Sequence, residues 1–404
     1  MSIRVLFLSL SIAGLCPALS LKEAIDQALA SRASLKAEAE RVTAAEGLKQ
    51  QAGLFPNPEF QFQNENLRPG QTYSRDVDTL AMINQSLDVL GKRRERVALA
   101  EKGVARTEAE VELVRWRIAS RVKLAYWTAR GAQELQAILK TTAGNFQKNI
   151  DYHAAQFSVG AIAEQDLLRV RLEGERLKIA ADLASIEANR ARAELFREMG
   201  QPVFSDVALS EPIEPGSTMP LGVEQALAQR AEMKVARAAL EQARANVRLQ
   251  DISARPDLNL TAGYKRTQLP DALSGVNTAI FSLRVTIPTT DKNQGNRATA
   301  AAEVRRQEQL LAAAETDVRT DYFAALQEYE LRRTEFLNAL GPLKEHAANI
   351  SEIAAAAYRE GGTDLLRLLD AERTRLEADL AWVRGMVDYR QSIARLEAAE
   401  GVVQ

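Results

Sequence analysis

The chain has 404 residues, of which 46% are hydrophobic and 26% are charged, and its formal net charge is -2. This balance excludes a disordered chain, and it argues against a nucleic-acid-binding protein, which would carry a large positive charge. Aromatic residues make up only 5% of the sequence, whereas alanine, leucine, arginine and glutamate are abundant. Such a composition is typical of long helices rather than of an aromatic-rich core.

The N-terminus predicts an export signal. Arg4 precedes an apolar run over residues 5–15, and small residues at which a signal peptidase could cut follow this run. The run is shorter than the roughly 20 residues that a membrane-spanning helix needs, so a membrane anchor is disfavoured. We expect residues 1–18 to be a signal peptide, with cleavage near Ala18 or Ser20.

Cys16 is the only cysteine, and its lipidation is an alternative to plain cleavage. Lipidation of this thiol would need a small residue before it, and Leu15 occupies that position. Plain cleavage therefore fits better, and it would leave a mature chain without cysteine. Such a chain could form no disulfide and use no thiol chemistry.

The chain is an internal duplication. A shift of 198 residues aligns QALASRASLK (27–36) with QALAQRAEMK (225–234), and the two segments agree at seven of ten positions. The same shift aligns Pro58 with Pro256, and it aligns the DLLR sequence at 166–169 with the one at 364–367. One shift that serves three distant segments is a strong signal of an internal repeat.

We expect the repeats to span residues 19–201 and 221–404, joined by a linker at 202–220 that is rich in proline and serine. Each repeat should contain a helix, a β-hairpin, a long helix and a shorter helix, in that order. In the first repeat the opening helix is expected from about Leu21 to Leu54.

Two stretches of alternating apolar and polar residues predict β-hairpins at 58–90 and 256–288. Pro56, Pro58 and Pro256 end the preceding helices, because proline lacks the amide that a helix needs and favours an extended residue before it. The apolar side of the strands is the candidate lipid-facing surface. Its candidate members are Phe60, Phe62, Leu260, Tyr264, Phe281 and Leu283.

Four strands of about ten residues, with one apolar and one polar face, have the period of a membrane β-barrel. Four strands are too few to close a barrel wide enough for a solute, so other copies of the chain would have to supply the rest. The polar face would line water in a pore, whereas in a filled soluble core its groups would be left unsatisfied.

A long helix should follow each hairpin, over about 92–152 and 296–358. Apolar residues at sevenfold spacing predict coiled-coil packing for these helices. A glycine-bearing turn then leads into a shorter helix that ends near Gly200 or Gly401.

Taken in order, these features resemble the TolC family of bacterial outer-membrane efflux channels. The resemblance rests on LSLKEAIDQAL at the start, GLFPNPEF before the first strand, the Gly-Lys-Arg exit at 91–93, the FSVG and YREG turns, and the duplication. It covers essentially the whole mature chain. AGLFPNPEF is most similar to the CzcC-type heavy-metal efflux branch.

The resemblance implies a mostly α-helical fold with a membrane β part. Three identical chains would each give four strands to one twelve-stranded outer-membrane β-barrel, and their coiled-coil helices would form a periplasmic α-barrel. The implied location is the outer membrane of a Gram-negative bacterium, with outer-membrane lipid around the barrel. The implied protein partners are a periplasmic adaptor, also called a membrane fusion protein, and an inner-membrane RND-type pump.

In the family, acidic residues near the last helix-turn-helix tip narrow the periplasmic entrance. The resemblance places Asp370 at one such position, whereas Arg367 occupies the companion position one turn earlier. These two residues could form part of a gate or only a surface ion pair at i,i+3 spacing, and the sequence leaves both possibilities open. The candidate gate residues at the two tips are Glu164, Asp166, Arg169, Asp364, Arg367 and Asp370.

The sequence shows no catalytic, cofactor-binding or metal-binding set. Its two histidines, His153 and His346, stand alone and are expected on the surface. It contains no glycine-rich nucleotide motif and no metal-site histidine spacing, so we expect neither an enzyme nor a resident metal or cofactor.

These observations predict the outer-membrane exit channel of a tripartite efflux system, a passive conduit for heavy-metal cations in the first place. One alternative is a periplasmic coiled-coil adaptor or scaffold, and another is a TolC-family channel for drugs or type I secretion. The polar second face of the strands favours a channel over an adaptor, because the β-domain of an adaptor would need a filled core.

Overall fold

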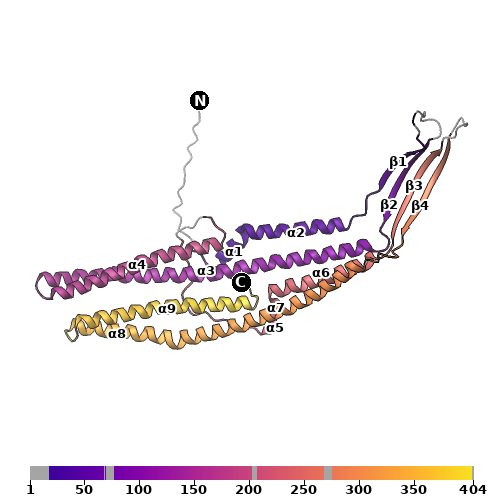
Figure 1. The fold of residues 1–404 in the computed structure, drawn as a ribbon. Coiled ribbons are helices and arrows are strands. Elements are labelled where there is room, and N and C mark those ends of the chain that lie inside the picture. Colours follow the sequence, from indigo (N-terminus) through magenta and orange to yellow (C-terminus); the bar gives the residue numbers. More distant parts are fainter. Residues whose placement is uncertain (1–17, 68, 70–76, 203–206, 268–274, 403–404) are drawn as a thin grey trace, which may run out of the picture. The chain divides into compact units, whose positions relative to one another are not determined.

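The computed structural model describes residues 18–67, 69, 77–202, 207–267 and 275–402 (Figure 1). Cys16 and nearly all of the expected signal peptide lie outside the described residues. The fold is mostly helical with one four-stranded antiparallel sheet, which confirms the expected fold class. In chain order the elements are α1 (Leu21–Ser31), α2 (Ala33–Ala52), β1 (Glu59–Glu65), β2 (Asp78–Leu87), α3 (Lys92–Ser158), α4 (Glu164–Glu198), α5 (Val223–Gln229), α6 (Ala231–Ser253), β3 (Asp257–Thr267), β4 (Val276–Thr286), α7 (Gln294–Glu335), η1 (Phe336–Leu340), α8 (Gly341–Arg359) and α9 (Leu365–Ala399).

Two compact units make up the chain, and each combines segments of both sequence repeats. The helical unit holds the described residues of 1–36, 114–230 and 317–404. The strand unit holds those of 37–113 and 231–316. The long helices α3 and α7 contribute to both units. The units therefore cut across the expected repeats, whose boundaries stay a prediction.

The opening helix of each repeat is broken once, which corrects the single helix expected from Leu21 to Leu54. Arg32 separates α1 from α2 with an extended backbone (φ -65°, ψ 115°). Arg230 separates α5 from α6 in the same way (φ -54°, ψ 130°). Arginine is a good helix former and gives no local signal of a break. The cause is tertiary, because both side chains bind the end of a distant helix.

The sheet has the strand order β1-β2-β3-β4, and every neighbouring pair is antiparallel. β1 pairs with β2 and β3 pairs with β4, which gives two hairpins, and the pairing of β2 with β3 joins the two halves of the sequence. Neither β1 nor β4 has a second partner among the described strands. The sheet therefore keeps two open edges.

The two long helices differ, although one uninterrupted helix is expected in each half. α3 runs for 67 residues and continues beyond its expected end near residue 152. In the second half the π-helical turn η1 separates α7 from α8. Pro342 follows at the start of α8, and proline cannot donate to the carbonyl four residues earlier. The hydrogen-bond pattern of the helix therefore changes to a wider π turn just before it. Gly385 of α9 makes room for this turn, because a Cβ on it would lie 2.0 Å from the Cδ1 atom of Leu340.

Glycines end both shorter helices. Gly200 (φ 72°) follows α4, and Gly401 (φ 78°) follows α9. In each case the next amide donates to a carbonyl in the last turn of the helix, at 2.9 Å. Glycine adopts the left-handed conformation that this ending requires at no steric cost.

Tyrosines tie the segment before each opening helix to a long helix. Tyr126 of α3 is fully buried, and its hydroxyl donates to the carbonyl of Leu19 at 2.8 Å. Tyr322 of α7 donates in the same way to the carbonyl of Leu221. Tyr389 of α9 donates to a carbonyl in the expected linker at 2.8 Å. The described part of the linker is therefore bound to the helical unit.

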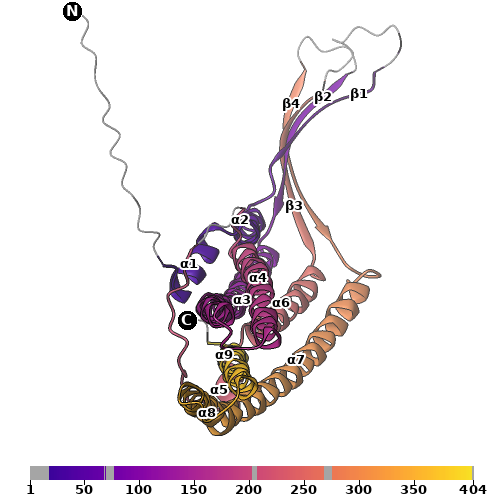
Figure 2. The same cartoon turned by 90° about the vertical axis from the view of Figure 1, so that its left-hand side faces the viewer.

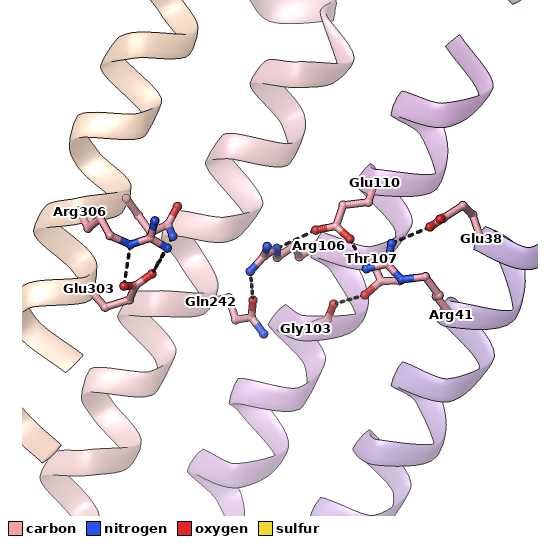
Figure 3. Close-up of polar contacts among 10 residues, drawn as sticks. Glu38, Arg41, Gly103, Arg106, Thr107, Glu110, Gln242, Glu303 and Arg306 are labelled. Atoms are coloured by element: carbon pink, nitrogen blue, oxygen red, sulfur yellow. Dashed lines mark hydrogen bonds and ion pairs between the residues drawn. The ribbon is translucent and has the colours of Figure 1, made fainter. Parts of the chain in front are cut away.

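Polar contacts join three helices of the strand unit (Figure 3). Arg41 of α2 and Arg106 of α3 both bind the carboxylate of Glu110, at 2.7 Å and 2.9 Å. Arg106 also donates to the side chain of Gln242 on α6 at 3.2 Å. These exposed or partly buried contacts fix which sides of the helices face each other more than they add stability.

In the helical unit, α3 with α4 and α8 with α9 form two helical hairpins (Figures 1 and 2). Their tips lie at the same end of this unit (Figure 1). No helix within the described residues combines the length and the apolar character that crossing a membrane would require.

Candidate functional site

The register of the sheet places all six candidate lipid-facing residues on one face. Phe60, Ile83, Ala262 and Phe281 lie opposite one another in successive strands, so their side chains share that face. Phe60 is 71% exposed and Phe281 is 78% exposed. The neighbouring rows of the same face are Phe62, Ala81, Tyr264 and Ala279, and Gln85, Leu260 and Leu283. We call this face the apolar sheet face.

The apolar sheet face ends at a polar row, at the end of the sheet where β1 leads to β2. This row contains Asn64, Thr79, Arg266 and Asn277. Tyr264 lies in the last apolar row, and its hydroxyl donates to the side chain of Asn277. Tyrosine suits such a boundary, because its ring is apolar and its hydroxyl needs a polar partner.

The opposite face of the sheet is mostly polar, although Leu80, Met82 and Ile280 also lie on it. Thr261 donates to the side chain of Asn84 at 2.6 Å, and Asn84 donates to that of Gln61 at 3.3 Å. The Lys265 ammonium lies 2.8 Å from a carboxylate oxygen of Asp78 on the neighbouring strand. These groups bind one another across strands and can face water, which a sealed apolar core would not supply.

Gln85 is the polar exception on the apolar sheet face, and the structure explains it. Its Nε2 group donates to the carbonyl of Pro56 at 2.9 Å and to the carbonyl of Ser86 at 2.9 Å. The amide therefore ties the start of the sheet to the segment that enters β1. The sequence pattern shows the interruption but not this partner.

The structure brings the six candidate gate residues to the two tips of the helical unit. Gly160 (φ 72°) and Gly361 (φ 75°) turn the chain at these tips. The candidates lie at the starts of α4 and α9, and they are Glu164, Asp166, Arg169, Asp364, Arg367 and Asp370. Burial, then Tyr152 and then the Asp166 carboxylate raise the pKa of Tyr358 on α8.

The two DLLR sequences occupy different positions in their helices. Asp364 caps α9, because its carboxylate accepts the amide of Arg367 at 2.9 Å. Asp166 lies inside the first turn of α4, which begins at Glu164 and has no side-chain cap at Ala163. Asp364 therefore has a structural role that its counterpart lacks, and the sequence alignment did not reveal this difference.

Arg367 and Asp370 are both exposed on α9. Within the described part of the chain they form no ion pair with each other, although i,i+3 spacing permits one. The surface pair, one of the two possibilities that the sequence left open, is thus not formed. Both remain free to meet groups of another molecule.

His153 corrects the expectation of two surface histidines. It is 5% exposed, its Nδ1 atom lies 2.7 Å from the carbonyl oxygen of Asn149, and its Nε2 atom lies 3.2 Å from the Tyr358 hydroxyl. The rings of His153 and Tyr358 stack at 6.2 Å between centroids. This contact joins α3 to α8 across 205 positions of sequence, so no local pattern could show it. His346 is exposed, as expected.

These features define a class of protein: an internally duplicated chain with two long helical hairpins and an open-edged antiparallel sheet that is apolar on one face and polar on the other. A profile described as "Outer membrane efflux protein" matches residues 24–201 and 222–402. The chain therefore belongs to the outer membrane efflux protein family.

Known relatives are similar over most of their length. The cobalt-zinc-cadmium resistance protein CzcC of Cupriavidus metallidurans is 23% identical over 367 residues, which cover 90% of this chain and 86% of CzcC. The cation efflux system protein CusC of Escherichia coli (strain K12) is 23% identical over 321 residues, which cover 76% of this chain and 69% of CusC.

Solved structures of the same fold extend the comparison. A CusC crystal structure superimposes with a TM-score of 0.75 and 19% identity, covering 95% of this chain and 92% of that chain. The open state of the MtrE outer membrane channel of Neisseria gonorrhoeae gives a TM-score of 0.75 and 20% identity, covering 95% of this chain and 89% of that chain. At these identities the likeness establishes the fold.

Proposed function

We propose that this chain is the outer-membrane exit channel of a tripartite efflux system, in which three copies build one passive conduit for heavy-metal cations. The observation that carries the proposal is the sheet, with two open edges, one apolar face and one polar face. In a bilayer such edges must pair, because unsatisfied backbone groups are costly there. Four strands from each of three copies would give a closed barrel of twelve.

Strand length and exposure support a membrane position for the sheet. β3 and β4 have 11 residues each, and a tilted membrane strand needs roughly 9–11 residues. Phe281 and Leu283, exposed by 78% and 60% in one chain, would contact lipid on the outside. Asn84 and Thr261 on the other face would contact water in the lumen.

Helix α4 carries an apolar seam that a second copy would cover. The seam residues are spaced by three, four or seven positions, so they lie along one side of the helix. Each of them is more than half exposed in the single chain. They are Leu168 (54%), Leu172 (55%), Ile179 (58%), Leu183 (61%) and Ile186 (61%). An exposed apolar seam of this length, interrupted by Glu175 and Arg176, marks a protein interface.

We assign the periplasmic entrance to the two helix tips. The six candidate residues bring four carboxylates and two guanidinium groups per chain to this end of the helical unit. Arranged around a threefold axis, groups of opposite charge from neighbouring copies would come within reach of one another. Since Arg367 and Asp370 do not pair with each other, they are available for a latch between copies.

The proposed substrates follow from the relatives, which are named for cobalt, zinc and cadmium resistance and for cation efflux. The proposed partners are a periplasmic adaptor and an inner-membrane RND-type pump. In this arrangement the pump provides the driving force and the choice of substrate. This chain provides the path through the outer membrane.

Membrane fractionation followed by gel electrophoresis tests the proposal. We expect the protein in the outer-membrane fraction, as a band of three chains before heating and of one chain after boiling. Cells that express it with its partners should accumulate less cobalt, zinc or cadmium than cells that lack it. Recovery in the soluble periplasmic fraction would contradict the channel, and unchanged metal content with an assembled trimer would contradict the substrate.

A further inference from the structure

A cavity of about 660 Å³ lies between the two helical hairpins, close to their tips. We call it the tip cavity. Tyr152 and His153 of α3, Tyr358 of α8 and Glu372 of α9 line it. Its volume falls within the range of roughly 300–1,000 Å³ that small-molecule sites occupy. All of its lining residues belong to the helical unit.

Glu372 places a carboxylate in the tip cavity without a counter-charge bound to it. Burial raises the pKa of this carboxyl, while the charges of Arg375 and His153 act in the opposite direction. Within the described residues the carboxylate takes part in no hydrogen bond and no ion pair. A partly buried carboxylate without a partner is stabilised by any cation that can reach it.

Gln156 supplies a second unused acceptor. Its Nε2 group donates to the Tyr152 hydroxyl at 2.9 Å. Its Oε1 atom is buried and has no hydrogen-bond partner in the described structure. A buried amide oxygen without a donor is unfavourable, and a rotation of this amide would present it to a ligand that brings an N–H group.

Two other polar side chains of the tip cavity are already engaged. The two ring nitrogens of His153 contact the Asn149 carbonyl and the Tyr358 hydroxyl. The guanidinium of Arg359 donates to the carbonyl of Ala355 at 3.2 Å. The Asn149 amide and the Thr363 hydroxyl also line the cavity, so the site offers one free carboxylate, several neutral oxygens and the faces of aromatic rings. Among the described residues no group of three His, Cys, Asp or Glu side chains could hold a metal ion, so this set suits an organic ammonium ion better.

We infer that the tip cavity binds a small organic cation with an ammonium group and an apolar body. The ammonium group is held by Glu372 and by the Oε1 atom of Gln156, and the apolar body packs on Tyr152 and Tyr358. This inference does not depend on the proposed export function, because the cavity is formed within one helical unit. A cation bound there would contact both hairpins.

Calorimetric titration of the purified full-length protein with phenethylammonium tests the inference. We expect saturable binding of one ligand per chain, with little binding of the uncharged analogue 2-phenylethanol. Glu372→Gln should weaken binding at least about tenfold, because a charge-assisted hydrogen bond is lost. Glu360→Gln, which removes an exposed carboxylate at the same tip, should leave binding unchanged. Binding should also weaken as pH falls, since Glu372 takes up a proton above the ordinary carboxyl range.

Each other outcome contradicts the inference. Equal binding of phenethylammonium by Glu372→Gln and by the unchanged protein would show that the carboxylate does not hold the ligand. Equal binding of 2-phenylethanol would show an apolar pocket without charge recognition. Zinc binding that depends on Glu372, without phenethylammonium binding, would show a metal site instead. Gel mobility before and after heating checks that Glu372→Gln still assembles, and Gln156→Leu gives a second variant that should weaken binding.

Discussion

Arg32 and Arg230 occupy matching places in the two halves of the sequence and perform the same structural task. Each has an extended backbone that breaks the opening helix of its repeat. Each guanidinium also donates to a backbone carbonyl oxygen at the end of the last helix of the same repeat, which is α4 for Arg32 and α9 for Arg230. Arg32 binds the carbonyl and the carboxylate of Glu198, and Arg230 binds the carbonyls of Ala398 and Ala399. A cation at this position satisfies carbonyls that the helix leaves free and opposes the negative end of its dipole.

Replacing Arg230 should destabilise the helical unit. This side chain is 5% exposed, and its guanidinium Nη2 atom lies 3.1 Å from a carboxylate oxygen of Asp321. Its Cζ atom lies over the Trp116 ring, 4.9 Å from the ring centroid. Arg230→Ala should cost about 1 to 3 kcal/mol, because buried carbonyls lose a charged donor. Arg244→Ala, which removes two exposed ion pairs, to Glu241 and Glu308, should cost less than about 0.5 kcal/mol. Thermal dissociation of the purified protein compares the two, and equal shifts would contradict the capping role.

The apolar sheet face predicts opposite effects at two adjacent positions of β4. Leu283→Arg should cost about 2 to 4 kcal/mol near the middle of a bilayer, because it places a charge against lipid. Ser282→Arg should be tolerated, because the register puts this residue on the polar face. The yield of assembled protein in the outer membrane measures both. A similar loss in both variants would argue against a membrane barrel.

The seam on α4 predicts that a charge placed on it blocks assembly. Ile179 is 58% exposed in the single chain and would be buried by a second copy. Ile179→Glu should remove the roughly 1.5 to 3 kcal/mol per copy that burial of this side chain contributes to assembly, and it should lower the fraction of trimers. Met219→Glu is the matched control, since Met219 is 86% exposed and lies off the seam. Light scattering after size exclusion gives the fractions, and unaffected trimers in Ile179→Glu would remove the seam from the interface.

The gate proposal predicts a leakier entrance when its charges are removed. Arg367→Ala combined with Asp370→Ala should raise single-channel conductance in planar bilayers. The rise should be larger at low salt, where charges are screened less. Asp364→Asn keeps the cap of α9 while removing its charge, so it separates a role in the latch from a role in folding. If the assembled double variant conducts like the unchanged protein, the latch lies elsewhere.

Local chemistry explains which features could be predicted from the sequence. The strands and their faces follow from alternation, and the cross-strand register confirms that Phe60 and Phe281 share a face. The helix ends near Gly200 and Gly401 follow from the left-handed conformation that glycine accepts. Such signals lie within a few residues of the feature that they predict.

The features that could not be predicted depend on distant partners. Arg32 breaks its helix because Glu198, 166 positions away, receives its hydrogen bonds. His153 is buried because Tyr358 lies 205 positions away in sequence. Likewise, the missing pair between Arg367 and Asp370 reflects side-chain directions that spacing alone does not fix. The gate and the lipid contact depend on further copies of the chain and stay predictions.

Cross-linking between the two edge strands tests most directly whether several copies share one barrel. In a Cys16→Ser background, cysteines replace Phe60 on β1 and one residue of the apolar sheet face on β4, tried in turn at 279, 281 and 283. Within one chain these strands are three spacings apart, or about 14 Å, so a disulfide can form only between copies. We predict that at least one pair gives covalent dimers and trimers in the outer membrane, with nothing larger, and that reduction returns single chains. Monomers at every pair, or a ladder that continues beyond three chains, would contradict a closed barrel built from three copies.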